Sequence, residues 1–185
     1  MLFRSMEFQE LLEKRRSIRN YDTDSRPEAD DIKDLVKAAL EAPSWKNTET
    51  GRYHCVLSEN MIQKFRAECL PEFNQRNSEH AAYIVTTYVR DTSGFHGHET
   101  KEADNELGNG WGCYDLGLQN ENLILKAVEC GFSTLIMGIR DADKIRELLA
   151  IPEEEVIVSV IAIGQAADFP SRPKRKNVDD VLSIY

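Results

Sequence analysis

The sequence predicts an α+β fold in a single domain over residues 1–185, with helices on both faces of a small sheet. Short runs of β-branched and aromatic residues alternate with longer stretches whose apolar residues recur at helical spacing. With 41% hydrophobic residues, a chain of 185 residues can bury one substantial core. We expect about four or five strands, whose order the sequence does not reveal.

Two helices are expected before residue 50. Ser5 precedes apolar residues at helical spacing over about 6–14 and is placed to cap that helix. The segment 25–28 combines a serine cap, a proline and a carboxylate, which is typical of a helix start. The second helix therefore runs to about Glu41, and Pro43 ends it.

The middle of the chain contains two expected strands separated by a helix. Tyr53–Leu57 and Ala81–Val89 are rich in the residue types that favour strands, and Ala81–Val89 is expected to be central in the sheet. Between them, residues 58–70 show helical spacing. Asp91–Gly110 is polar, contains glycine and lacks a period, so we expect a mobile loop, of the kind that often covers a site.

The last third predicts a long helix and a buried strand. Apolar residues surround most of the helix over 111–130, which predicts burial between layers or against a second subunit, and Gly131 stops it. A short apolar segment follows over 132–139. Asp141 is placed to cap a helix that ends near Ala150, and Val156–Ile163 reads as a buried strand.

Charge and composition exclude several classes of protein. The net charge is -9, and phosphate neutralisation by a nucleic-acid-binding protein needs a broad basic surface. No apolar run approaches the roughly 20 residues of a membrane span, and the N-terminus lacks the pattern of a signal peptide. The widely spaced cysteines favour neither disulfides nor a thiolate metal site, so we expect a reduced, cytoplasmic protein. They are Cys55, Cys69, Cys113 and Cys130.

Two basic clusters stand out on this acidic chain. The first contains Arg15, Arg16 and Arg19, and the second is 174–176, Lys-Arg-Lys. Guanidinium groups match phosphate oxygens bidentately, so the first cluster predicts an anionic cofactor. The alternative is a basic helix end, and for the second cluster a solvated basic strip.

The sequence offers no self-sufficient catalytic group. It contains no Gly-x-Ser-x-Gly elbow, no Gly-x-Gly-x-x-Gly loop and no Walker lysine. His54 reads as a structural residue, and 96–99, His-Gly-His-Glu, is either a metal site or, more simply, a solvated loop. Trp111 and Tyr114 either shape a substrate pocket or fill the core or an interface. A chain with two basic clusters and no self-sufficient redox or nucleophilic group suggests that a bound phosphorylated cofactor supplies the chemistry.

Five segments, in this order, resemble the nitroreductase family of FMN-dependent enzymes. Arg15-Arg16-Ser17-Ile18-Arg19-Asn20-Tyr21 resembles the family's Arg-Arg-Ser-x-Arg-x-Phe opening. The remaining four are Ala42-Pro43-Ser44-Trp45-Lys46-Asn47, Cys130 through Gly138, Ile151 through Gly164, and the basic tail Pro173-Lys174-Arg175-Lys176. Together they are spread along nearly the whole length of the chain.

The resemblance implies a mostly antiparallel central sheet flanked by helices, in an intertwined homodimer with FMN at the interface. NADH or NADPH would donate electrons in a ping-pong reaction that reduces a nitroaromatic, a quinone or a similar acceptor. The flavin carries that chemistry, so no catalytic side chain is required.

The resemblance also implies cofactor-binding roles for individual residues. Arg15 and Arg16, joined by Arg175 or Lys176, would hold the FMN phosphate, with Ser17 supporting this end. Arg19 would lie by the pyrimidine edge of the flavin, where a cation stabilises the charge added on reduction. The residues expected to line the ring are Pro43, Ser44 and Asn47, from the other subunit, with Met137 and Gly138 near N5.

The chain departs from the family pattern after Asn47. Glu49-Thr50-Gly51 stands where the family usually has Gln-Pro-Trp, which adds a negative charge and removes an aromatic wall. This departure leaves two alternatives open: a non-catalytic flavin-binding or regulatory protein on the same fold, and a relative that cleaves flavin or dehalogenates an aromatic.

Overall fold

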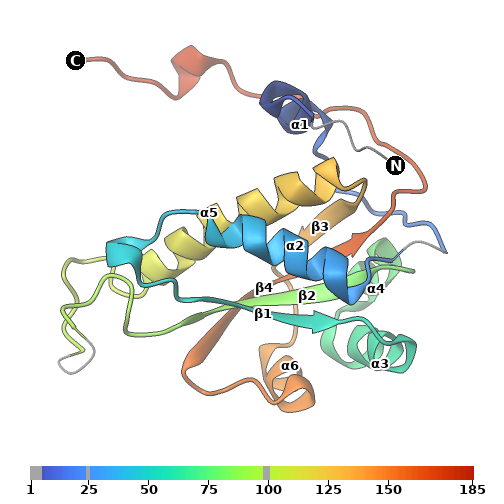
Figure 1. The fold of residues 1–185 in the computed structure, drawn as a ribbon, viewed down its shortest axis with the longest axis horizontal. Helices are drawn as coiled ribbons and strands as arrows, with labels where there is room; N and C mark the ends of the chain where they lie inside the picture. The colour runs from blue at the N-terminus through green and yellow to red at the C-terminus, as the bar shows by residue number, and fades with distance from the viewer. Residues whose placement is uncertain (1–5, 24–25, 98–100) are drawn as a thin grey trace.

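The computed structural model describes residues 6–23, 26–97 and 101–185, and its centre is a four-stranded antiparallel sheet (Figure 1). The strands lie in the order β1-β2-β4-β3. Their bounds are Gly51–Val56 for β1, Ala82–Val89 for β2, Ser133–Met137 for β3 and Glu155–Gly164 for β4. The α+β class predicted from the sequence is confirmed.

The two central strands supply most of the core. Of the eight residues of β2, seven are buried, and β4 is buried over its last six residues. Burial on both faces explains why these runs are continuously β-branched or aromatic rather than alternating. The ladder between β2 and β4 is antiparallel, with one register shift between Thr86 and Thr87.

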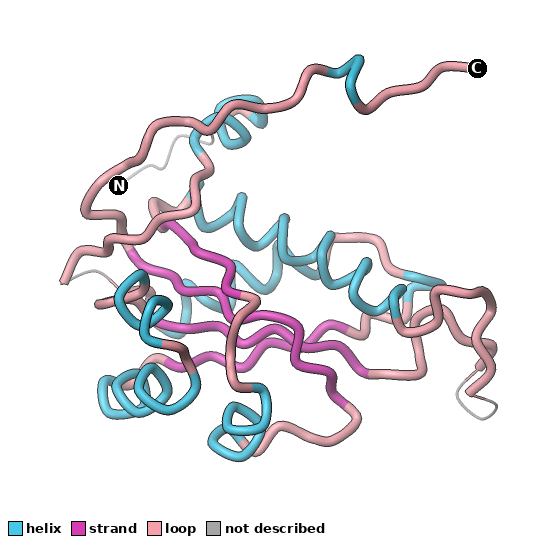
Figure 2. The backbone as a smooth tube through the Cα atoms, turned by 180° about the vertical axis from the view of Figure 1, so that it is seen from behind, coloured by secondary structure: helices cyan, strands magenta, loops and turns pink. Residues whose placement is uncertain are grey.

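Helices cover both faces of this sheet, as the sequence predicts. Figures 1 and 2 show α2 and α5 on one side and α3 and α6 on the other. The shortest described α-helices, α1, α4 and α6, have six to eight residues. The helix bounds are Phe8–Lys14 for α1, Ala29–Leu40 for α2, Glu59–Cys69 for α3, Glu72–Asn77 for α4, Gly110–Glu129 for α5 and Ala142–Leu149 for α6.

Two helix ends follow the predicted chemistry. Gly131 ends α5 with φ +85°, the left-handed conformation that glycine adopts without strain. Asp141 caps α6, since its Oδ1 accepts the Lys144 backbone N–H at 3.1 Å.

Other local expectations need correction. The cap of α2 is Glu28, which forms a capping box with Asp31, and the helix begins one residue later. The serines expected to cap the first two helices, Ser5 and Ser25, lie outside the described residues. Strand β1 begins at Gly51, two residues earlier than expected, and the helix α4 was not predicted.

The C-terminal segment leaves the sheet as an extended arm, which we define as residues 167–185. Apart from a short 3-10 helix over Val178–Asp180, the arm has no regular structure, and every residue in it is exposed. Figures 1 and 2 show it passing α1 and continuing away from the sheet. It exposes several large apolar side chains, namely Phe169, Val178, Val181, Leu182 and Ile184. Within the described residues, no helix combines the length and apolarity needed to cross a bilayer.

Candidate functional site

The arginine-rich segment after α1 is held between the sheet and the start of the arm. The Ile18 N–H donates to the Thr134 carbonyl at 3.0 Å, and the Ala167 N–H donates to the Asn20 carbonyl at 3.0 Å. Ile18 and Tyr21 are buried and anchor the segment, as expected. The residues between them therefore face outward beside the arm.

This arrangement brings the two basic clusters together in one pocket of about 370 Å³. Its lining contains four arginines, two prolines and two serines, and no acidic residue. The lining residues are Arg15, Arg16, Ser17, Arg19, Pro170, Ser171, Pro173 and Arg175. Lys176 is exposed on the arm but does not line the pocket.

One hydrogen-bond donor of Arg16 has no acceptor among the described residues. Its Nη1 donates to the backbone carbonyls of Glu13 at 2.5 Å and Arg15 at 2.7 Å. Its Nε is buried and has no hydrogen-bond partner among the described residues. A buried donor left unpaired costs about 1–3 kcal/mol, so the guanidinium fits an anionic ligand that supplies oxygen acceptors. These residues suit the phosphate of FMN.

The start of β3 lies beside the arginine-rich segment. A parallel bridge pairs Ser17 with Thr134, near the start of that strand. Met137, at its other end, is 3% exposed, and its side chain packs in the core. Gly138 is exposed, and apart from Gly138 itself and its two chain neighbours no described atom lies within 4 Å of where its Cβ would be.

The other predicted cofactor-lining residues do not join the arginines within one protomer. Pro43 and Ser44, exposed and half-buried, lead into the 3-10 helix η1, Trp45–Asn47, and Asn47 is its exposed last residue. The Trp45 N–H donates to Asp115 in the second turn of α5, whereas the arginines lie beside β3, which follows the other end of that helix. The long helix therefore separates the two groups.

An aromatic and ionic cluster surrounds η1. Trp111 lies between Trp45 and Tyr114, with ring centroids 4.6 and 5.5 Å away. Lys46 of η1 forms an ion pair at 2.8 Å with Asp104, which belongs to the 91–110 loop. The loop expected to cover a site is thus fastened to η1. Sequence reasoning missed Asp104 and Asp115; the only signal was a carboxylate among the apolar positions of the long helix.

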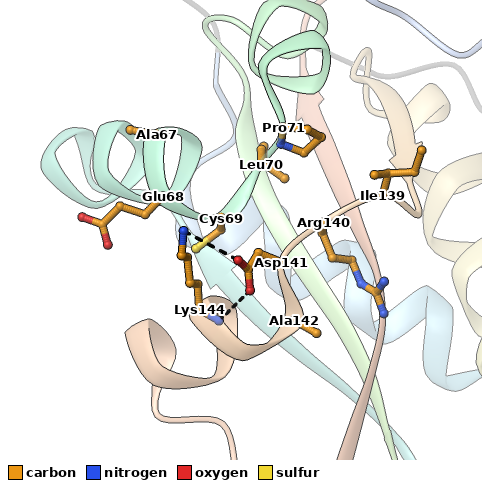
Figure 3. Close-up of a pocket in the computed structure, with 10 residues that line it drawn as sticks. All are labelled: Ala67, Glu68, Cys69, Leu70, Pro71, Ile139, Arg140, Asp141, Ala142 and Lys144. Carbon is orange, nitrogen blue, oxygen red and sulfur yellow. Dashed lines mark hydrogen bonds and ion pairs between the residues drawn. The ribbon is translucent and has the colours of Figure 1, made fainter.

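A second pocket, of about 550 Å³, lies between α3 and α6 on the other face of the sheet. Figure 3 shows Asp141 and Lys144 facing each other there, while the Arg140 guanidinium points away from them. Glu68 and Asp141 balance the two cations of the lining. Burial raises the pKa of the Cys69 thiol to about 11, which keeps it protonated and unreactive near pH 7. This pocket lacks the surplus positive charge of the arginine pocket.

The histidines contribute no metal centre to the described part of the chain. No group of three His, Cys, Asp or Glu residues there is arranged to hold a metal ion. Of the His-Gly-His-Glu segment, His98 and Glu99 lie outside the described residues. His54 pairs with the buried Glu155 at 2.7 Å, which agrees with the structural role expected for it.

Comparison with known proteins agrees with this architecture. A candidate NADH dehydrogenase/NAD(P)H nitroreductase of Archaeoglobus fulgidus is 29% identical over 163 residues, which cover 83% of this chain and 82% of that protein. Protein DrgA of Synechocystis is 23% identical over 184 residues, covering 89% of this chain and 86% of that one. The crystal structure of a candidate nitroreductase from Exiguobacterium sibiricum in complex with FMN has a TM-score of 0.83 at 23% identity, with 98% of each chain covered. The model of the nitroreductase family matches residues 12–165, most of the length of the sequence. The chain therefore belongs to the nitroreductase family.

Proposed function

We propose that this protein is an FMN-dependent NAD(P)H oxidoreductase that reduces a nitroaromatic, a quinone or a similar acceptor. The observation that carries the proposal is the pocket with four arginines, no acidic residue and a buried, unpartnered Arg16 Nε. Guanidinium groups bind phosphate through charge-assisted, bidentate hydrogen bonds. The FMN complex of the Exiguobacterium relative and the NAD(P)H nitroreductase name of the Archaeoglobus relative support this choice of cofactor and donor.

In this proposal the chain's own residues bind and orient the cofactor. Arg15 and Arg16, with Arg175, hold the phosphate, and Ser17 supports that end; Lys176, which does not line the pocket, is left out of this role. FMN, when bound, supplies the two-electron redox chemistry that links nicotinamide oxidation to reduction of the acceptor in a ping-pong sequence. The residues proposed to line the flavin ring are Arg19, Pro43, Ser44, Asn47, Met137 and Gly138. Because the Met137 side chain packs in the core, its segment contributes mainly backbone at the exposed Gly138.

We also propose that the working form is a homodimer with the cofactor at the interface. Pro43, Ser44 and Asn47 lie at the opposite end of α5 from the arginine pocket, so one protomer does not supply both sets of contacts. The exposed apolar side chains of the arm, such as Val181 at 69% and Ile184 at 87%, favour burial against a second copy. A second copy would supply the missing ring-lining residues.

The visible spectrum of the purified protein tests the cofactor and the activity together. We expect a flavin spectrum, either as purified or after reconstitution with FMN, and loss of its long-wavelength absorbance when NADH or NADPH is added without oxygen. Flavin that neither nicotinamide reduces would favour a binding or regulatory protein. A chain that stays colourless after reconstitution would reject both functions.

Arg19→Ala is expected to lower the reduction potential of bound FMN by about 30 mV, which for a two-electron couple corresponds to about 1.4 kcal/mol. Arg19 is exposed and lines the arginine pocket, and in this proposal its cation stabilises the negative charge that reduction adds. Equilibration with a reference dye measures the potential. Arg19→Lys, which keeps the charge, is the matched control and should stay near the wild-type value. An unchanged potential in Arg19→Ala with FMN still bound would remove Arg19 from this role.

A further inference from the structure

The Asp115 carboxylate is buried beneath the turn that carries Ser44 and Asn47. Asp115 is 2% exposed and lies on the buried side of α5. Among the described residues it accepts hydrogen bonds from two neutral donors, the Trp45 backbone N–H at 2.9 Å and the Ser93 hydroxyl at 2.6 Å. A charge in the protein interior is unfavourable unless it is well hydrogen-bonded. These two hydrogen bonds stabilise the buried carboxylate and join α5 to the turn and to Ser93.

The hydrogen bonds form a continuous chain around the turn. The two hydrogen bonds that Asp115 accepts end on the same oxygen, Oδ2. Ser93 is 1% exposed and uses its single proton toward Asp115, so its oxygen must accept the proton of Thr48, whose Oγ1 lies 2.8 Å away. Asp115 thereby fastens Trp45 directly and Thr48 through Ser93. The two ends of the turn are attached to one helix.

The turn held in this way has an unfavourable backbone. Lys46, Asn47 and Glu49 have φ of 48°, 55° and 48°, which is the left-handed region where residues with a Cβ are disfavoured. Such residues persist only where the surrounding contacts over-determine them. Within the turn, Ser44 accepts the Asn47 N–H through its carbonyl at 3.0 Å and the Glu49 N–H through its Oγ at 3.1 Å.

We propose that Asp115 is a positioning residue that holds this strained turn in the conformation that presents Ser44 and Asn47 to the flavin ring. The inference rests on the proposed function, because the ring is its target. Asn47 lies between the two attachment points, Trp45 and Thr48, so the carboxylate fixes its direction without touching the ligand. The ion pair of Lys46 with Asp104 is a second attachment, on the side of the 91–110 loop.

Two replacements at this position test the proposal. Asp115→Leu removes the hydrogen-bond acceptor and keeps a similar side-chain volume. It should weaken the binding of FMN and of riboflavin by the same factor, about 10- to 100-fold. Their affinity ratio should not change, because the phosphate end is untouched. Asp115→Asn keeps one oxygen that can accept both hydrogen bonds, so it should restore affinity to within about 5-fold of wild type. Flavin fluorescence titration measures both ligands.

Hydrogen–deuterium exchange on the FMN-free protein supplies an independent readout. Asp115→Leu should accelerate exchange at residues 44–50 and leave β2 protected. Faster exchange throughout the chain, or unchanged riboflavin affinity, would overturn the proposal. Should Asp115→Leu fail to fold, Ser93→Ala removes one of the two donors and must show a smaller effect in the same direction. Absence of FMN binding by the wild-type chain would refute the proposed function instead, and exchange at 44–50 would still decide whether Asp115 orders the turn.

Discussion

Arg16→Ala is expected to weaken FMN binding by about 30-fold or more, while riboflavin binding stays close to the wild-type value. Arg16 is half-buried and its Nε has no described partner, so in the proposed site a phosphate oxygen would form a charge-assisted bond with this guanidinium out of bulk water. Riboflavin lacks the phosphate, so its dissociation constant should not change when the Arg16 side chain is removed. The ratio of the two dissociation constants, from fluorescence titration, isolates the phosphate contribution from any general loosening.

The matched control is Arg76→Ala, which removes the same charge from α4. Arg76 is 69% exposed and pairs with Glu72 on its own helix, so both flavins should bind as they do to wild type. Arg175→Ala should weaken FMN in the same selective way but less, since Arg175 is on the exposed arm. Equal losses for FMN and riboflavin in Arg16→Ala would show that the phosphate binds elsewhere.

Gly112→Ala is expected to destabilise the protein by about 1–3 kcal/mol, a typical cost of overpacking a filled interior. A Cβ at Gly112 would lie 2.3 Å from Cδ2 of Tyr88, whose side chain is 4% exposed on β2. Gly112 and the Tyr88 ring are both buried, so the added methyl group must displace packed atoms. Denaturation of the FMN-free protein measures the effect, and for a chain of this size each kcal/mol corresponds to roughly 2–4 °C in melting temperature.

Gly117→Ala, on the same helix, is expected to stabilise the protein rather than destabilise it. A Cβ at Gly117 meets no described atom within 4 Å, and alanine is favoured over glycine in a helix interior by up to about 1 kcal/mol. We therefore expect a small rise in stability. If both alanine variants changed stability by the same amount and in the same direction, the close contact between α5 and β2 would be wrong.

Much of the fold follows from local sequence, because hydrophobic period and turn chemistry act over a few residues. Val156–Ile163 lies within β4, and Gly131 ends α5 where expected. Helix α4 escaped prediction because it is six residues long, and its one buried residue, Asn74, is polar. That side chain donates to the Ile139 carbonyl at 2.8 Å, a tertiary contact with no local signal.

The candidate site divides in the same way between local and tertiary information. A cluster of arginines is visible in the sequence, but its meeting with Arg175 depends on hydrogen bonds that join 18 to 134 and 20 to 167. Asp115 was not predicted to matter, because a single carboxylate in a helix usually faces solvent. Its burial follows from the packing of α5 against β2 and the turn, which local period does not encode.

Ligand binding in the arginine pocket would favour the position that the arm has in this structure. Arg175 lies on a segment whose residues are all exposed, yet its side chain lines the same pocket as Arg15 and Arg16. A phosphate that contacts both sides stabilises the docked tail over any detached one by mass action. Occupancy of the pocket would then set the fraction of molecules whose arm is held beside α1.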